Sequence, residues 1–234
     1  MDVVYKCLIN SGFSRVSPKG SGPLVVLGVP GCGKSSVIRQ LLCSDSRFIA
    51  LTFGAPDFVR ADGRFVRKAC NPGVNHEGKF LLLDEFQCGD WKSYSPDVIF
   101  GDISQVDTLI DIPEVNFCKF ESHRIGLSTA SFLRTLGFEI NSSKPDKLEF
   151  GGIFEKEPEG VVIAQNRAVC DFISGQGLEH VKVEDYRGAT YKVVTLILEE
   201  PFISPDLRAG FYLSATRHSE KLVILTPDAS RPTC

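Results

Sequence analysis

A glycine-rich segment near the start of the chain has the residue types and spacing that bind phosphate. Residues 28–35, GVPGCGKS, fit the pattern G-x-x-x-x-G-K-[ST] without a gap. Glycines let the backbone turn its N–H groups around a phosphate, Lys34 adds positive charge, and Ser35 offers a hydroxyl to Mg²⁺. The sequence therefore predicts a nucleotide-binding loop made of Gly28, Val29, Pro30, Gly31, Cys32, Gly33, Lys34, Ser35 and Ser36.

Two adjacent acids follow a later apolar run. Asp84 and Glu85 come directly after Phe80-Leu81-Leu82-Leu83. In phosphoryl transfer one carboxylate holds Mg²⁺ and another acts on the attacking water. We expect Asp84 to share Mg²⁺ with Ser35, and Glu85 to polarise the water. Such a pair could also be the exposed start of a loop, but the glycine-rich segment favours the catalytic interpretation.

Two arginines in the second half of the chain could complete such a site. Negative charge spreads over the γ-phosphoryl oxygens in the transition state, and a guanidinium meets it with paired donors. Arg124 and Arg217 are the candidates. Each arginine taken alone is also compatible with a surface salt bridge. For His218, beside Arg217, we expect packing or hydrogen bonding rather than acid/base catalysis.

The elements that must position these residues are short apolar runs alternating with helical segments. Continuous β-branched runs are typical of strands buried on both faces of a parallel sheet. The sequence predicts strands at 24–27, 48–53, 80–83, 98–100, 161–164 and 193–198, and helices at 34–43, 128–136 and 166–173. This alternation predicts an α/β fold with a parallel sheet covered by helices.

The domain count is less constrained than the fold class. A length of 234 residues allows one large domain or two compact ones. We favour two α/β units, joined between residues 112 and 122. Residues 141–160 are rich in Gly, Pro and charged side chains, which predicts a long surface loop.

Composition limits the class of protein. The chain has 43% hydrophobic and 24% charged residues, as soluble globular proteins do, and its eight cysteines form no C-x-x-C pair. This pattern argues against a zinc site or a disulfide framework and indicates a reducing compartment. No apolar run approaches the ~20 residues of a membrane span, and the N-terminus does not resemble a signal peptide.

Neither the net charge nor the local clusters of basic residues indicate where a nucleic acid would bind. The net charge is −3, so nucleic acid would have to bind in a local groove. The most basic stretch contains Arg60, Arg64, Arg67 and Lys68, for which a solvated face is favoured over phosphate contact. Aromatic residues just past the carboxylates, Trp91 and Tyr94, could stack on bases, but packing in a loop is favoured.

The motifs, taken in order, resemble those of one family. GVPGCGKS, LLLDEFQ and GDISQ are similar to the first core domain of superfamily 1 helicases, which implies that Gln105 senses the γ-phosphate. A nucleoside kinase or a GTPase would share Lys34 and Ser35 but has no reason to carry GD-x-x-Q. SHRIG around Arg124 and SATRHSEKLVIL around Arg217 resemble later family segments. The resemblance implies two RecA-like P-loop domains, 1–118 and 119–234, with Arg124 and Arg217 as arginine fingers from the second.

A chain with both core domains and little else resembles the first triple-gene-block movement protein of filamentous plant RNA viruses, of the carlavirus or potexvirus type. This implies an RNA-stimulated NTPase and helicase that uses ATP or another NTP with Mg²⁺, binds single-stranded and viral RNA, transports viral RNA between cells and suppresses RNA silencing. Other viral movement proteins and coat protein are implied as partners, together with a homo-oligomer. The implied location is the host cell cytoplasm, with access to plasmodesmata through partners.

Two segments depart from the family pattern. The family usually has Gln before the Gly of the segment that here reads Arg187-Gly188, and residues 51–56 match the RNA-contacting pattern only loosely. We therefore assign no RNA contacts from them. Two classes of function stay open: an ATP-driven RNA helicase, or a non-catalytic RNA-binding silencing suppressor and transport protein with nucleotide as a conformational ligand. Retention of Glu85 favours the enzyme, because a site that only holds nucleotide needs no base.

Overall fold

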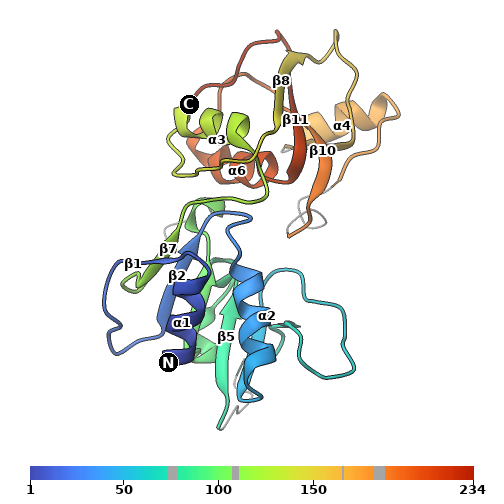
Figure 1. Cartoon of the computed structure of the whole chain (residues 1–234). Helices are drawn as coiled ribbons and strands as arrows, with labels where there is room; N and C mark the ends of the chain where they lie inside the picture. Colours follow the sequence, from blue (N-terminus) through green and yellow to red (C-terminus); the bar gives the residue numbers. More distant parts are fainter. Residues whose placement is uncertain (73–77, 107–110, 165, 182–187) are drawn as a thin grey trace. The chain divides into compact units, whose positions relative to one another are not determined.

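The computed structural model describes residues 1–72, 78–106, 111–164, 166–181 and 188–234 (Figure 1). The chain divides into two compact units, each with its own sheet. The first unit is Met1–Ile103 with Thr108–Phe120, and the second is Ser104–Asp107 with Glu121–Cys234. The main division thus falls between Phe120 and Glu121.

The first unit is built on a seven-stranded sheet. The strand order is β1 (Ser14–Arg15), β7 (Phe117–Lys119), β2 (Leu24–Gly28), β6 (Val98–Gly101), β5 (Phe80–Asp84), β3 (Phe48–Thr52) and β4 (Arg67–Lys68). All neighbouring strands are parallel except β1 and β7. The four strands predicted in this part agree with β2, β3, β5 and β6 to within one residue.

Helices α1 (Asp2–Asn10) and α2 (Lys34–Ser44) lie on the same face of this sheet (Figure 1). α2 buries Val37, Ile38 and Leu41, which recur at helical spacing and therefore form one apolar stripe. A separate apolar cluster is centred on Phe86, and Trp91 packs edge-on against that ring with centroids 6.5 Å apart. Tyr94 makes a similar contact with Phe53 at 5.5 Å, so the predicted loop packing of Trp91 and Tyr94 is confirmed.

Sheet order brings three motif-bearing strands to one edge. β6 lies between β2 and β5, with Leu27 paired to Gly101 and Asp84 paired to Phe100. Because the carboxyl ends of parallel strands lie at the same edge, the segments that follow β2, β5 and β6 gather there. Short 3-10 helices follow β5 and β6: η1 (Phe86–Cys88) with η2 (Trp91–Tyr94), and η3 (Ile103–Gln105).

The second unit contains a fully parallel four-stranded sheet in the order β8 (Lys147–Gly152), β11 (His218–Thr226), β10 (Tyr191–Ile197) and β9 (Val161–Ala164). Helices α3 (Leu127–Thr135) and α6 (Arg208–Ala215) lie on one side of it, and α4 (Arg167–Gly175) on the other (Figure 1). A 3-10 helix, η4 (Pro205–Leu207), precedes α6. The α/β class with parallel sheets is thus confirmed.

The predicted surface loop at 141–160 is wrong, because it contains the edge strand β8. Leu148 pairs with Leu222 and Phe150 with Ile224 along β11. Phe150 also meets the ring of Phe132 on α3, with centroids 5.2 Å apart. An edge strand has one partner and is only half covered, so polar and glycine residues are tolerated there and hide the apolar signal. In the described ranges, no helix is both long and apolar enough to cross a bilayer.

Candidate functional site

The glycine-rich loop connects β2 to α2 at the edge where the three strands end. Gly33 has φ +106°, a conformation that side chains with a Cβ rarely adopt, and it precedes the first residue of α2. Within the part of the chain that the structure describes, no side chain caps this helix start, so its N–H groups face the loop and favour an anion. Gly28 is required for a different reason: a Cβ there would lie 2.4 Å from the Cys32 sulfur. The loop therefore has the backbone geometry of a phosphate cradle.

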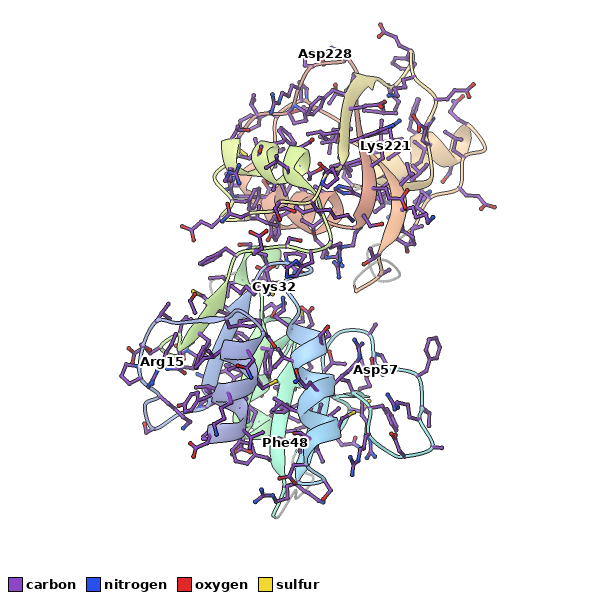
Figure 2. The ribbon with its side chains drawn as sticks, in the orientation of Figure 1. Arg15, Cys32, Phe48, Asp57, Lys221 and Asp228 are labelled. Atoms are coloured by element: carbon purple, nitrogen blue, oxygen red, sulfur yellow. The ribbon has the colours of Figure 1, made fainter. Side chains whose placement is uncertain are left out.

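Cys32, labelled in Figure 2, is buried and packs against Gly28 within this loop. Its side chain is 1% exposed, and burial raises the pKa of its thiol. A thiol with a raised pKa stays protonated and unreactive at neutral pH. Cys32 is therefore a small packing residue of the loop.

Lys34 lies inside the loop, with its Nζ donating to the carbonyls of Gly28 at 2.6 Å and Val29 at 3.3 Å. Burial alone would lower the pKa of Lys34, but the surrounding groups outweigh burial and raise the pKa above its usual value. These groups include the carboxylates of Asp102, Glu85 and Asp84. The structure thus brings the predicted lysine together with both predicted carboxylates. A phosphate would replace these two neutral carbonyls with a charged partner for the Lys34 ammonium.

Asp84, the last residue of β5, has an unusual environment for a carboxylate. Burial, reinforced by Glu85 and opposed by Lys34, raises the pKa of Asp84 to about 7. In the described part of the chain, its buried Oδ1 has no hydrogen-bond partner. A buried acceptor without a donor is costly and calls for a ligand. A divalent cation matches this need, because Mg²⁺ prefers carboxylate and hydroxyl oxygens.

Glu85 is held in a turn with φ +54°, which is rare for a residue with a side chain. Gln87 donates a hydrogen bond from Nε2 to Glu85 Oε2, while its Oε1 accepts one from the Asp102 backbone N–H at 3.3 Å. Gly54 lies against the same side chain, since a Cβ there would be 3.1 Å from Glu85 Cγ. The carboxylate is therefore oriented by the segments after β3, β5 and β6.

Sequence reasoning missed Gln87, Asp102 and Gly54 as parts of this site. The first two lie in LLLDEFQ and GDISQ, which were recognised as motifs without a role for these two residues. Their positions inside recognised motifs were thus the signal by which Gln87 and Asp102 could have been found. Gln87 touches Gly101 so closely that a Cβ there would lie 2.3 Å from its Oε1, a contact that becomes visible only when β5 and β6 are paired.

Gln105 ends η3, just beyond β6, and its side chain is buried. The two predicted arginine fingers belong to the second unit. Arg217 is 2% exposed and donates to the carbonyls of Leu213 at 2.9 Å and Ala189 at 3.4 Å. Arg124 precedes α3 and is half-buried. Arg187, where this chain departs from the family pattern, lies outside the described residues.

His218, the first residue of β11, is buried between α3 and α6. Its Nδ1 lies 3.0 Å from the Ala215 carbonyl and its Nε2 lies 3.3 Å from Asp146 Oδ2. Burial raises the pKa of Asp146, but hydrogen bonds from His218, Thr129 and Ser128 outweigh it and hold that pKa well below its usual range. The predicted hydrogen-bonding role of His218 is confirmed.

Comparison with known proteins identifies the family. Residues 24–226 match the viral superfamily 1 RNA helicase core domain. The chain belongs to this family. It is 36% identical over 230 residues to the movement and silencing protein TGBp1 of Poplar mosaic virus, and the match covers 98% of each chain. It is 34% identical over 220 residues to TGBp1 of Potato virus X strain X3, and that match covers 93% of this chain and 95% of the relative. The recognised resemblance to carlavirus and potexvirus proteins is confirmed.

Solved helicase structures share the fold. The structure of arterivirus nonstructural protein 10 (helicase) with DNA superposes with a TM-score of 0.65 at 20% identity, over 95% of this chain and 63% of that one. The PRRSV helicase gives 0.59 at 17% identity, over 97% and 54%. The chain thus spans less than two thirds of the length of these helicases. At such identity the likeness concerns the fold alone.

Membership of this helicase family implies the use of nucleotide and Mg²⁺. The residues present fit both a nucleotide and Mg²⁺. The glycine cradle and Lys34 suit a polyphosphate, and the orphaned Asp84 oxygen with the Ser35 hydroxyl suits Mg²⁺.

Proposed function

We propose that this chain is an RNA-stimulated NTPase and helicase that acts on ATP or another NTP with Mg²⁺. The observation that supports it best is the buried, unsatisfied Oδ1 of Asp84 beside the charged Lys34, at the sheet edge where the glycine-rich loop starts. A purely structural role for Asp84 would leave the cost of this orphaned oxygen unexplained.

Within this proposal, each residue of the first unit has a distinct task. Lys34 would exchange its carbonyl partners for the outer phosphates, and Ser35 and Asp84 would hold Mg²⁺, which would neutralise phosphate charge. Glu85, oriented by Gln87, accepts the proton of the attacking water. Because these side chains are buried or held by hydrogen bonds, they need little reorganisation when negative charge spreads over the γ-phosphoryl oxygens in the transition state.

The second unit would add positive charge. We assign residues 1–118 and 119–234 to two RecA-like domains, with Gln105 sensing the γ-phosphate and Arg124 and Arg217 contacting it from the second domain. Arg217 must then exchange carbonyl partners in its own unit for phosphate oxygens. A site completed only by both domains couples nucleotide turnover to domain motion, which is how such an enzyme would move along RNA.

The TGBp1 relatives are named movement and silencing proteins. We extend these roles to this chain: cell-to-cell transport of viral RNA and suppression of RNA silencing, in the host cytoplasm and at plasmodesmata through partners. The partners we propose are single-stranded and viral RNA, other viral movement proteins and coat protein.

Steady-state phosphate release, with and without single-stranded RNA, tests the enzymatic proposal. Wild type should be stimulated by RNA, whereas Lys34→Ala and Glu85→Gln should lose activity by about 10²–10⁴-fold, as expected when charge stabilisation or a base is removed. Equal rates in wild type and both variants would refute the proposal.

A second candidate is a non-catalytic RNA-binding silencing and transport protein with nucleotide as a conformational ligand. It is favoured by the names of the relatives, which specify movement and silencing rather than hydrolysis. Gel shifts separate the two: RNA binding of equal strength with and without ATP, in wild type and Lys34→Ala alike, supports this candidate when phosphate release is also absent.

A further inference from the structure

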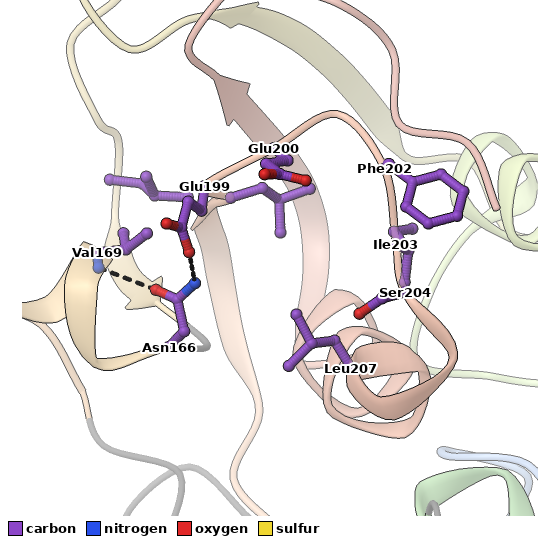
Figure 3. Close-up of a pocket in the computed structure, with 10 residues that line it drawn as sticks. Asn166, Val169, Glu199, Glu200, Phe202, Ile203, Ser204 and Leu207 are labelled. Atoms are coloured by element: carbon purple, nitrogen blue, oxygen red, sulfur yellow. Dashed lines mark hydrogen bonds between the residues drawn. The ribbon is translucent and has the colours of Figure 1, made fainter.

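Arg217 lies at the amino-terminal edge of the second sheet, because it comes immediately before β11 and all four strands are parallel. Ligands of parallel α/β sheets ordinarily bind at the opposite edge, beyond the carboxyl ends of the strands. In this unit that edge carries a pocket of about 210 Å³, lined in part by Asn166, Glu199 and Ser204 (Figure 3). Arg217 is therefore remote from the pocket, and other contacts must position it.

A short segment before β8 lies beside the stretch that contains Arg124. We call residues 142–146 the bridging segment. The Ser142 hydroxyl donates to the Ile125 carbonyl at 2.8 Å, and the carbonyl two residues later accepts from the Leu127 N–H at 2.7 Å. The bridging segment is thus attached by hydrogen bonds to the residues that lead into α3.

Lys144 connects this stretch to the one that contains Arg217. Its Nζ donates to the Arg124 carbonyl at 3.1 Å and also to the carbonyl of Ser219, two residues after Arg217. An ammonium has three N–H donors, so it can hold both carbonyls at once. Hydrogen bonds from a charged donor are stronger than those between neutral groups. Lys144 therefore fixes the backbone at Arg124 relative to the start of β11.

Asp146 forms a second connection between the same two stretches. Its Oδ2 accepts from the Gly126 N–H at 3.1 Å and lies 3.3 Å from Nε2 of His218. The side chains of Asp146 and His218 are fully buried. The approach requires a glycine, because a Cβ at Gly126 would lie 2.4 Å from the Asp146 Cβ. Gly126 is two residues after Arg124, and His218 directly follows Arg217, so this connection also reaches both arginines.

We propose that Lys144 and Asp146 are positioning residues that hold Arg124 and Arg217 as one preassembled pair for the γ-phosphate. This inference rests on the proposed function, which assigns both arginines to the nucleotide. Each connection is attached within two residues of each arginine, so the two backbones are held together. Guanidinium groups held in place before charge develops need little reorganisation in the transition state.

Steady-state phosphate release with saturating single-stranded RNA tests Lys144 through its separate effects on kcat and KM. Lys144→Met keeps a long side chain but cannot donate, and should lower kcat about tenfold while KM for ATP stays within about twofold. Lys144→Arg can still donate to both carbonyls and should keep kcat within about threefold of wild type. Lys147→Met, at an exposed lysine of β8, is the matched control and should be silent.

A second control separates positioning from stability. Thr195 on β10 is fully buried, and its hydroxyl exchanges two hydrogen bonds with the Glu159 backbone, at 2.7 and 2.8 Å. Thr195→Val removes both bonds while keeping the shape of the side chain. It should lower the free energy of unfolding in urea at least as much as Lys144→Met does, and leave kcat unchanged.

A double-mutant cycle tests whether Lys144 acts through the arginines. In a chain that carries Arg124→Gln and Arg217→Gln, adding Lys144→Met should lower kcat by no more than about twofold, because the groups that it positions are gone. The same substitution in the wild-type background should keep its full effect.

A binding measurement gives a readout that needs no hydrolysis. ADP with aluminium fluoride resembles the phosphoryl group in transfer, so aluminium fluoride should strengthen the binding of a fluorescent ADP analogue in the presence of Mg²⁺ and single-stranded RNA. Lys144→Met and Asp146→Asn should each lose most of this gain. Lys147→Met and Thr195→Val should retain it.

Several results would overturn the positioning role. These are a kcat for Lys144→Met equal to that of Lys147→Met, an equal loss of kcat in Thr195→Val, and an undiminished loss in the chain without the two arginines. An aluminium fluoride gain that is absent from wild type, or undiminished in Lys144→Met and Asp146→Asn, would also overturn it. A wild type that releases no phosphate would refute the proposed NTPase, and the aluminium fluoride measurement would still decide the positioning role.

Discussion

Replacing Gln87 by methionine removes two hydrogen bonds at the candidate site while keeping the size of the side chain. The bond to the Glu85 carboxylate is a hydrogen bond to a charged group, of a kind that contributes about 1.5–3 kcal/mol. The bond from the Asp102 N–H is longer, at 3.3 Å, and weaker. If the first bond is needed to orient Glu85 in the transition state, its loss lowers kcat by about 10–100-fold, since each 1.36 kcal/mol is tenfold in rate.

The assay is steady-state phosphate release with saturating single-stranded RNA over a range of ATP concentrations. We expect KM for ATP to stay within about twofold of wild type, because the phosphate cradle and Lys34 are untouched. Gln176→Met, at the exposed C-cap of α4, is the matched control and should be silent. A kcat for Gln87→Met equal to that of Gln176→Met, or a loss confined to KM, would refute the positioning role.

Three further predictions follow from single contacts. In wild type Mg²⁺ should strengthen the binding of a fluorescent ATP analogue, and in Asp84→Asn this Mg²⁺ effect should disappear; an unchanged effect would exclude Asp84 as a ligand. Gly28→Ala should lower the free energy of unfolding in urea by about 1–3 kcal/mol through its clash with the Cys32 sulfur, and adding Cys32→Ala should recover most of it. Asp146→Ala should destabilise the second unit by about 2–4 kcal/mol, because it removes a helix cap and the carboxylate partner of His218 Nε2. The pKa of Asp146 is lowered in the folded protein, so this stabilisation is present above its unfolded value of about 4 and is lost as pH falls below it; urea titrations at several pH values should show wild type approaching the variant in acid.

Local sequence determined much of the first unit. The strand before Gly28 and the helix after Gly33 are contiguous with the loop, so the motif and its flanks could be predicted together. The apolar runs of β3, β5 and β6 were equally clear, because strands buried on both faces need continuous apolar sequence. The clustering of Lys34 with Asp84 was expected from the two motifs, each at the carboxyl end of a predicted strand of a parallel sheet.

Non-local pairing explains what was missed. β8 was predicted as a loop because it lies in a stretch rich in Gly, Pro and charged residues, whereas its pairing with β11 makes it a strand. The contact of Gln87 with Asp102 depends on the register of β5 against β6, which no single segment encodes. The ion pair of Arg39 on α2 with Asp57, in the segment between β3 and β4, likewise joins residues that are far apart in the sequence.

β11 has nine residues, so a strand of about 30 Å separates Arg217, just before it, from Pro227, just after it. Mutational effects at sites this far apart are generally additive. Natural variation can therefore remodel one end of the second unit while the other keeps its inherited chemistry. The sequences at the two ends of the second unit can therefore diverge among relatives at different rates.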